Sequence, residues 1–126
     1  MLSDQDRIRL EKAFLGAALL TNNLAPAKTI RPEMLTSPKR QAILKAMLVA
    51  GARGEQFDAI SLACDLSTGP EPAPKIGWLP TIAGYLDDMC ADMGFEYAER
   101  IRVNFETTRA HELVDRFKNG GNPSGR

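Results

Sequence analysis

The chain has 126 residues, of which 44% are hydrophobic and 25% charged, and its charges cancel to a net charge of zero. This length suits one domain with a single core, and the composition excludes a disordered or membrane-embedded class. No apolar run approaches the roughly 18 residues that span a bilayer, and the charged start MLSDQDRIRLEK lacks the apolar region of a secretory signal. We therefore expect a cytoplasmic protein without membrane contact.

The charges are nonetheless divided between the two halves of the chain. Residues 1–54 hold nine lysines and arginines against four acids, a net charge of +5, whereas residues 55–126 hold seven against twelve, a net charge of −5. Such complementary halves suit contacts between copies, or with a protein partner, better than they suit the wrapping of nucleic acid. The alternative is that they are two solvated faces that happen to differ.

The first predicted helix covers residues 4–21. Ser3 followed by Asp6 resembles a capping box, and apolar residues recur behind it at helical spacing. Gly16 lies in the interior of this helix, which is typical of a place where another helix comes very close. The helix should end at Asn22.

A second helix is predicted over residues 38–52, because Ser37 is favoured as a cap and Pro38 as a first helical residue. Its sequence, PKRQAILKAMLVAGA, is apolar almost all the way round. A helix of this kind is buried, so we expect it to be the centre of the fold. Met34 and Leu35 should pack into the core beside it.

Three further helices are predicted in the second half of the chain. Asp58 is placed to cap a short helix over residues 59–67, and the proline-rich stretch TGPEPAPKIG that follows reads as an exposed loop. Apolar residues then recur at three and four from Trp78 to Cys90. The last helix, over residues 95–117, would be about 35 Å long, so its second half should protrude from the globule.

These elements predict an all-α fold, a small orthogonal bundle of five to six helices around a buried central helix, with a longer C-terminal helix. Residues 1–118 form the domain in this prediction. Residues 119–126 are expected to be a disordered tail, because their sequence, NGGNPSGR, contains no apolar residue that could pack on the core.

No catalytic, cofactor-binding or metal-binding motif is present in the sequence. There is no phosphate-binding G-x-x-x-x-G-K-[ST] or G-x-G-x-x-G pattern, and the single histidine, His111, has no nucleophile motif to serve. Cys64 and Cys90 lie far apart in apolar patterns, so we expect them to be reduced, buried and inert. The residues alone therefore lead to an all-α interaction module and name no partner.

The order of the features is similar to the N-terminal domain of bacterial replicative DNA helicases of the DnaB type. The resemblance covers roughly residues 6 to 117 and includes an E-x-A-x-L-G-x-x-L helix. In the family the last helix is the first arm of a helical hairpin, whose second arm is missing here, so the chain is an excised domain or a small stand-alone relative. The matching residues are Glu11, Ala13, Leu15, Gly16 and Leu19, then Leu35, Ile43, Gly54, Asp58, Leu62 and Leu66, then Gly84 to Leu86, and finally Tyr97, Ala98, Ile101 and Arg109.

The resemblance implies a module that does not hydrolyse ATP, a task that a separate domain of an ATP-dependent parent helicase would perform. It implies a collar of a ring that pairs with copies of itself, docks primase or a helicase loader in the primosome, and meets nucleic acid only indirectly. Partner contact is expected at Phe105, Arg109, Leu113 and Phe117, because their helix has too little globule to cover it; the alternative is packing against the first helix. A rival function is a small helical regulator that binds nucleic acid through the basic first half.

Overall fold

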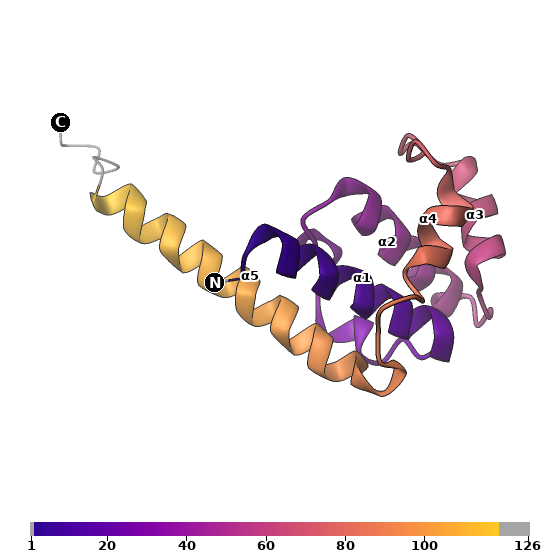
Figure 1. Cartoon of the computed structure of the whole chain (residues 1–126), viewed down its shortest axis with the longest axis horizontal. Helices are drawn as coiled ribbons and strands as arrows, with labels where there is room; N and C mark the ends of the chain where they lie inside the picture. Colours follow the sequence, from indigo (N-terminus) through magenta and orange to yellow (C-terminus); the bar gives the residue numbers. More distant parts are fainter. Residues whose placement is uncertain (1, 119–126) are drawn as a thin grey trace.

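The computed structural model describes residues 2–118, and within them the regular secondary structure consists of helices joined by loops, without a strand. This confirms the predicted all-α fold with a long C-terminal helix (Figure 1). The predicted tail, residues 119–126, lies outside the described residues. The elements are the helices α1 (Asp4–Thr21), α2 (Pro38–Ala52), α3 (Ala59–Ser67), α4 (Trp78–Gly84) and α5 (Gly94–Lys118), with the short 3-10 turns η1 (Ala27–Thr29), η2 (Pro32–Met34) and η3 (Ala91–Met93).

The first three helices begin where their capping residues predict. The Ser3 hydroxyl accepts a hydrogen bond of 3.1 Å from the backbone N–H of Asp6, at the start of α1. The Asp58 carboxylate accepts one of 2.7 Å from the N–H of Ser61, whose hydroxyl accepts in return from the N–H of Asp58, so α3 starts with a capping box. At the far end of α1, Asn22 adopts a left-handed conformation with φ of 53° and closes the helix.

Two helices supply much of the core: α2, which was predicted to be the buried central helix, and α1, which holds the longest continuous buried run. All residues from Ala13 to Leu19 are buried, and Glu11 is buried as well. In α2 the buried residues are Ile43, Leu44, Met47 and Ala50, whereas Val49 is half exposed. α1 packs mainly on α5 and η3, whereas α2 packs on α3 and η2 and also contacts α1. Met34 and Leu35 are buried, as predicted.

Gly16 marks the closest approach to α1. A Cβ atom at this position would lie 2.0 Å from the carbonyl oxygen of Tyr85, so only glycine fits without movement of the backbone. We expected this neighbour to be another helix. It is instead the turn that follows α4, because α4 ends at Gly84 and not near Cys90. The turn after α4 nevertheless keeps Tyr85 buried, which is why the apolar spacing continues beyond the helix.

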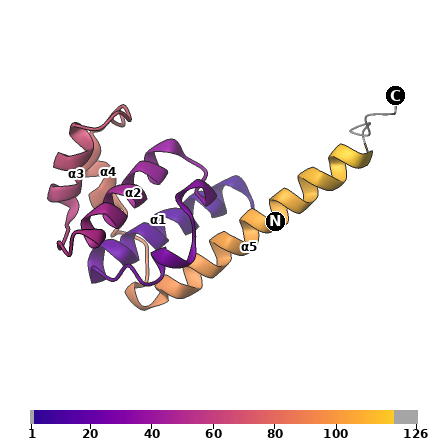
Figure 2. The same cartoon turned by 180° about the vertical axis from the view of Figure 1, so that it is seen from behind.

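The molecule is elongated, with α3 and α4 at one end and the distal half of α5 extending from the other (Figures 1 and 2). The first half of α5 packs on α1, η1 and η2, where Ala98 and Ile101 are buried. Cys64 and Cys90 are free but exposed, which corrects the prediction that both are buried. Each lies within a series of apolar residues, but its own side chain is exposed to solvent.

Candidate partner-binding surfaces

The distal part of α5, residues 109–118, leaves the globule, and we refer to it as the arm (Figure 1). Phe105 precedes it, is half buried and packs against the core. The guanidinium carbons of Arg31 and Arg109 lie 5.9 Å and 5.7 Å from the centroid of its ring, within the range of cation–π attraction. Phe105 therefore anchors the arm to the globule.

Of the four residues predicted to contact a partner, Phe105 is thus the one that packs on the core. Arg109 is exposed, and Leu113 and Phe117 are 50% and 77% exposed. The structure brings Phe105 and Arg109 together and leaves Leu113 and Phe117 in the distal part of the arm. Their contact with a partner stays a prediction, but their exposure leaves these two apolar side chains free for one.

The apolar residues of the arm do not continue the buried face of α5. With about 100° of rotation per residue, Val114 lies about 180° and Phe117 about 120° from Phe105 around the helix axis. A stripe of small and apolar residues instead runs along the opposite side, and Val103, Val114 and Phe117 in it are 46%, 49% and 77% exposed. We call it the arm stripe, made of Val103, Thr107, Ala110, Val114 and Phe117.

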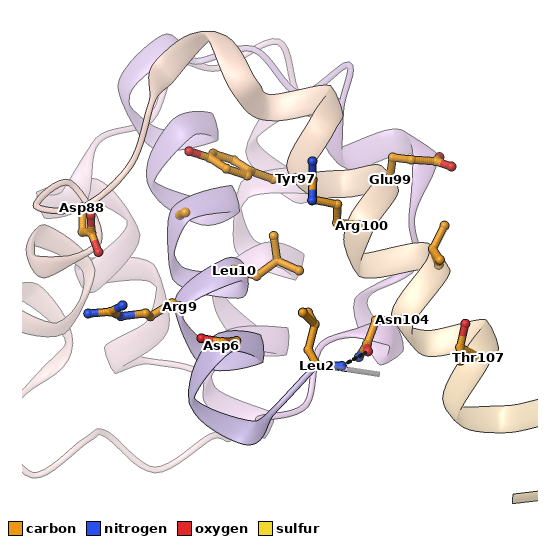
Figure 3. A pocket seen from close by; sticks show the side chains of 12 residues that line it. Leu2, Asp6, Arg9, Leu10, Asp88, Tyr97, Glu99, Arg100, Asn104 and Thr107 are labelled. Carbon is orange, nitrogen blue, oxygen red and sulfur yellow. Dashed lines mark hydrogen bonds between the residues drawn. The ribbon is translucent and has the colours of Figure 1, made fainter. Parts of the chain in front are cut away.

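A groove of ≈ 550 Å³ lies between the first half of α1 and the middle of α5 (Figure 3). Val103 and Thr107 of the arm stripe line it, so the groove and the stripe are continuous. One end is tied by the backbone N–H of Leu2, which donates a hydrogen bond of 3.1 Å to the side-chain oxygen of Asn104. We call it the α1–α5 groove; its apolar lining comes from Leu2, Leu10, Ala13 and Val103, and its charged lining from Asp6, Arg9, Asp88, Glu99 and Arg100.

A second apolar hollow, of ≈ 410 Å³, lies where the end of α1 meets the start of α3 and the turn after α4. We call it the head groove. Leu20, Ile60 and Leu86 line it and are 58%, 63% and 38% exposed, whereas Leu19 and Phe57 form its buried base. The apolar spacing of Ile60 with Leu62 and Leu66 in α3 predicts that it faces inward, and its exposure shows that this prediction is wrong. Neither groove was predicted, because each is formed by segments far apart in sequence that no local spacing brings together.

The relative position of α1 and α2 is fixed by a buried carboxylate. Glu11 is 1% exposed, and its oxygens accept hydrogen bonds from the N–H and the hydroxyl of Thr36 and from Nε of Arg40, the last at 2.7 Å. The guanidinium of Arg40, itself 13% exposed, also donates to the Thr36 hydroxyl. Burial raises the pKa of the neighbouring Tyr85, an effect that the charge of Arg40 opposes and that of Glu11 reinforces. This network serves folding, because it links three segments and faces neither groove.

The basic first half of the chain offers fewer free cations than its net charge indicates. Four of its nine basic residues form ion pairs with acids: Arg7 with Asp4, Arg31 with Glu33, Lys39 with Glu71 and Arg40 with Glu11. Among residues 2–118, no three His, Cys, Asp or Glu side chains are grouped as a metal site would require. A helix capable of crossing a membrane is likewise missing from that range.

No protein-family profile matches the sequence, and no curated protein matches it significantly. A solved structure does: the crystal structure of the N-terminal domain of DnaB helicase from Mycobacterium tuberculosis, at 24% sequence identity and a TM-score of 0.80. The match covers 93% of this chain and 85% of that one. The resemblance predicted from the order of sequence features is thereby confirmed at the level of the fold, and the chain has the fold of the N-terminal domain of DnaB helicase.

Proposed function

We propose that residues 1–118 form a non-catalytic protein-interaction and oligomerisation module of a replicative DNA helicase. In this role the domain acts in the cytoplasm as part of the collar of the ring, where it docks primase or a helicase loader during DNA replication and meets nucleic acid only through the assembled helicase. The fold supports this proposal. The single observation that carries it is the exposed arm stripe, an apolar surface on a helix with no covering segment among residues 2–118.

The placement of the two apolar surfaces supports a ring in particular. A subunit of a ring needs two contact surfaces, one for each neighbour. The arm stripe and the head groove lie at opposite ends of the long axis of the molecule (Figure 1), so they can engage two different copies at the same time. A single compact dimer interface would not explain both.

Direct binding of nucleic acid through the basic first half is the rival function. Arg40 is held in the buried network with Glu11, and Lys39 donates to Glu71 and to the carbonyl oxygen of Pro72 at 2.6 Å. These cations are neutralised within the chain, so that with the pairs of Arg7 and Arg31 five of the nine basic residues remain for phosphates. The exposed apolar side chains of the arm stripe and the head groove favour the interaction module over the nucleic-acid regulator.

Sedimentation velocity over a wide range of protein concentration, beside fluorescence anisotropy with labelled single- and double-stranded DNA, tests the proposal. We expect reversible self-association that hardly responds to salt, because an apolar interface is little screened. A DNA complex held by several phosphate contacts would instead weaken by orders of magnitude between about 50 and 200 mM salt. If the chain stays monomeric at every concentration and binds DNA in this salt-dependent way, the proposed role in the collar is refuted and the rival function is established.

Docking is tested with purified primase and purified loader from the same cell. The chain is immobilised through a tag at its N-terminus, and each protein is passed over it. The proposal expects saturable binding of one of them. Self-association without binding of either would restrict the function to oligomerisation.

A further inference from the structure

Helix α4 exposes an apolar surface at the end of the molecule opposite the arm (Figure 1). Residues 76–86 contain no charged side chain, yet several of them are exposed, among them Ile76 at 68% and Leu79 at 42%. At about 100° per residue, the exposed residues of α4 occupy one continuous arc of about 140°, and its buried residues lie on the other side. No other segment of residues 2–118 covers this arc. We call the surface the α4 face, made of Ile76, Leu79, Pro80, Ala83 and Gly84.

The outward position of Ile76 is fixed by the loop that precedes α4. The Nζ of Lys39 donates a hydrogen bond of 2.6 Å to the carbonyl oxygen of Pro72, which ties this loop to the start of α2. On the other side of the loop, the N–H of Gly77 donates one of 2.9 Å to the carbonyl oxygen of Pro74 and closes a turn around Ile76. Prolines and these bonds restrict the loop in the free chain, so little further ordering is needed when Ile76 meets a partner.

The two ends of the α4 face carry opposite charges. Lys75 precedes the face and Asp87 follows it; both are exposed, and within residues 2–118 neither forms an ion pair. The dipole of α4 has the same direction, positive at the end near Lys75 and negative at the end near Asp87. No acid in the first turn of α4 and no base in its last turn offsets this dipole. The face is therefore an apolar surface between a positive and a negative end.

We propose that the α4 face docks a helix of a protein partner. The docked helix presents an apolar side that is bounded by a carboxylate at one end, opposite Lys75, and by a lysine or arginine at the other, opposite Asp87. This inference rests on the proposed docking of primase or a loader, and it assigns to that docking a surface and a partner chemistry. It leaves the arm stripe and the head groove for contacts between copies.

The form of the α4 face favours a helix over an extended peptide. Residues 2–118 contain no strand whose edge could pair with a peptide backbone. A Cβ atom at Gly84 would meet nothing within 4 Å, so the space beside Gly84 and Ala83 is open to the backbone of a partner helix. Ile76 and Leu79 can then pack between its side chains as ridges pack into grooves. Because α4 is only about 10 Å long, the contact should be small and its dissociation constant in the micromolar range.

A matched pair of variants tests the surface. The chain, tagged at its N-terminus, is titrated with purified primase and with purified loader in biolayer interferometry. For whichever protein binds, Leu79→Asp should weaken the affinity at least about tenfold, because it places a charge in the centre of the apolar contact. The control is Val49→Asp on α2, which introduces the same side chain at a residue that is 50% exposed, against 42% for Leu79. The control should bind as wild type does, and circular dichroism should show that both variants are folded.

Charge variants test the polarity of the face. Lys75→Glu and Asp87→Lys should each weaken binding about threefold to tenfold. Their combination restores the net charge of the chain but reverses the polarity of the face, so it should bind more weakly than either single variant. Wild-type affinity in this double variant would show that only the net charge matters, and it would overturn the proposal. Since all of these positions are exposed, no loss of folding is expected.

Photo-crosslinking identifies the docked segment. Ala83→Cys is made in a background with Cys64→Ser and Cys90→Ser, because both native thiols are exposed, and it carries a photoreactive maleimide. The crosslinked peptide of primase or loader should belong to a helix with apolar residues three and four apart and opposite charges at its two ends. A crosslink to a segment without this pattern, or to a second copy of this chain, would refute the proposal.

The outcomes separate this inference from the proposed function. Binding of primase or loader that is unchanged by Leu79→Asp and by the charge variants would place the docking site elsewhere, so the inference would fail while the docking stands. A wild-type chain that binds neither protein contradicts the proposed docking, and the inference fails with it.

Discussion

Glu11→Ala should be among the most destabilising single changes in this protein, although Glu11 touches neither groove. The substitution leaves the Arg40 guanidinium, 13% exposed, without its carboxylate, and the N–H of Thr36 without its acceptor. Removing one partner of a buried ion pair costs about 3–5 kcal/mol. Arg40 retains a hydrogen bond to the Thr36 hydroxyl and some access to water, so we expect the lower end, about 3 kcal/mol.

The assay is urea unfolding followed by far-UV circular dichroism. A loss of about 3 kcal/mol is a large part of the roughly 5–15 kcal/mol that stabilises a typical domain. It should appear as a lower midpoint with an unchanged slope. The matched control is Glu33→Ala, which breaks the Arg31–Glu33 pair of 3.1 Å between side chains that are 60% and 62% exposed. That change should cost at most about 1 kcal/mol.

A double variant identifies the cause. If the loss of stability comes from the unpaired guanidinium of Arg40, then Glu11→Leu combined with Arg40→Met should be less destabilising than the sum of the two single changes. A Glu11→Ala protein within about 1 kcal/mol of wild type would refute this reasoning. It would mean that water or a shifted Arg40 compensates the loss, and that the network does not hold α1 against α2.

Three further changes test other parts of the structure. Met47→Asp places a charge where the side chain is fully buried, costs several kcal/mol, and should abolish the thermal unfolding transition. Gly16→Ala places a Cβ 2.0 Å from the Tyr85 carbonyl oxygen and should lower the free energy of unfolding, measured in urea, by about 1–3 kcal/mol. An unchanged midpoint of unfolding would show that the turn at Tyr85 moves to make room for the methyl group. Leu113→Asp with Phe117→Asp should abolish association in analytical ultracentrifugation while the melting temperature hardly changes; unfolding of this variant would make the arm part of the core.

Features that depend on neighbouring residues could be predicted from the sequence. The caps at Ser3 and Asp58 act within three residues, and the bounds of α1 and α3 followed from them. The predicted end of the fourth helix near Cys90 was wrong because apolar spacing reports burial and not backbone conformation. Tyr85 is buried in a turn, and its position in an apolar series is the same as in a helix.

Features formed by distant segments could not be predicted in this way. Glu11 and Arg40 are 29 residues apart, and each reads as a surface charge in its own helix; only the resemblance singled out Glu11. The protruding arm could be predicted because the last helix is longer than the globule that the other helices form. The direction of its apolar face could not, because it depends on how Phe105 packs on the core.

The anchoring of α5 at Phe105 gives the arm a fixed length and a fixed angular phase. Deleting one residue, such as His111, would draw the tip in by about 1.5 Å and turn Val114 and Phe117 by about 100° away from the line of Val103. Removing seven residues would shorten the arm by about 10 Å yet turn the tip by only about 20°. The reach of the arm can therefore change with little loss of its apolar direction only in certain steps, of about 7, 11 or 18 residues, and related chains with arms of other lengths should differ by such steps.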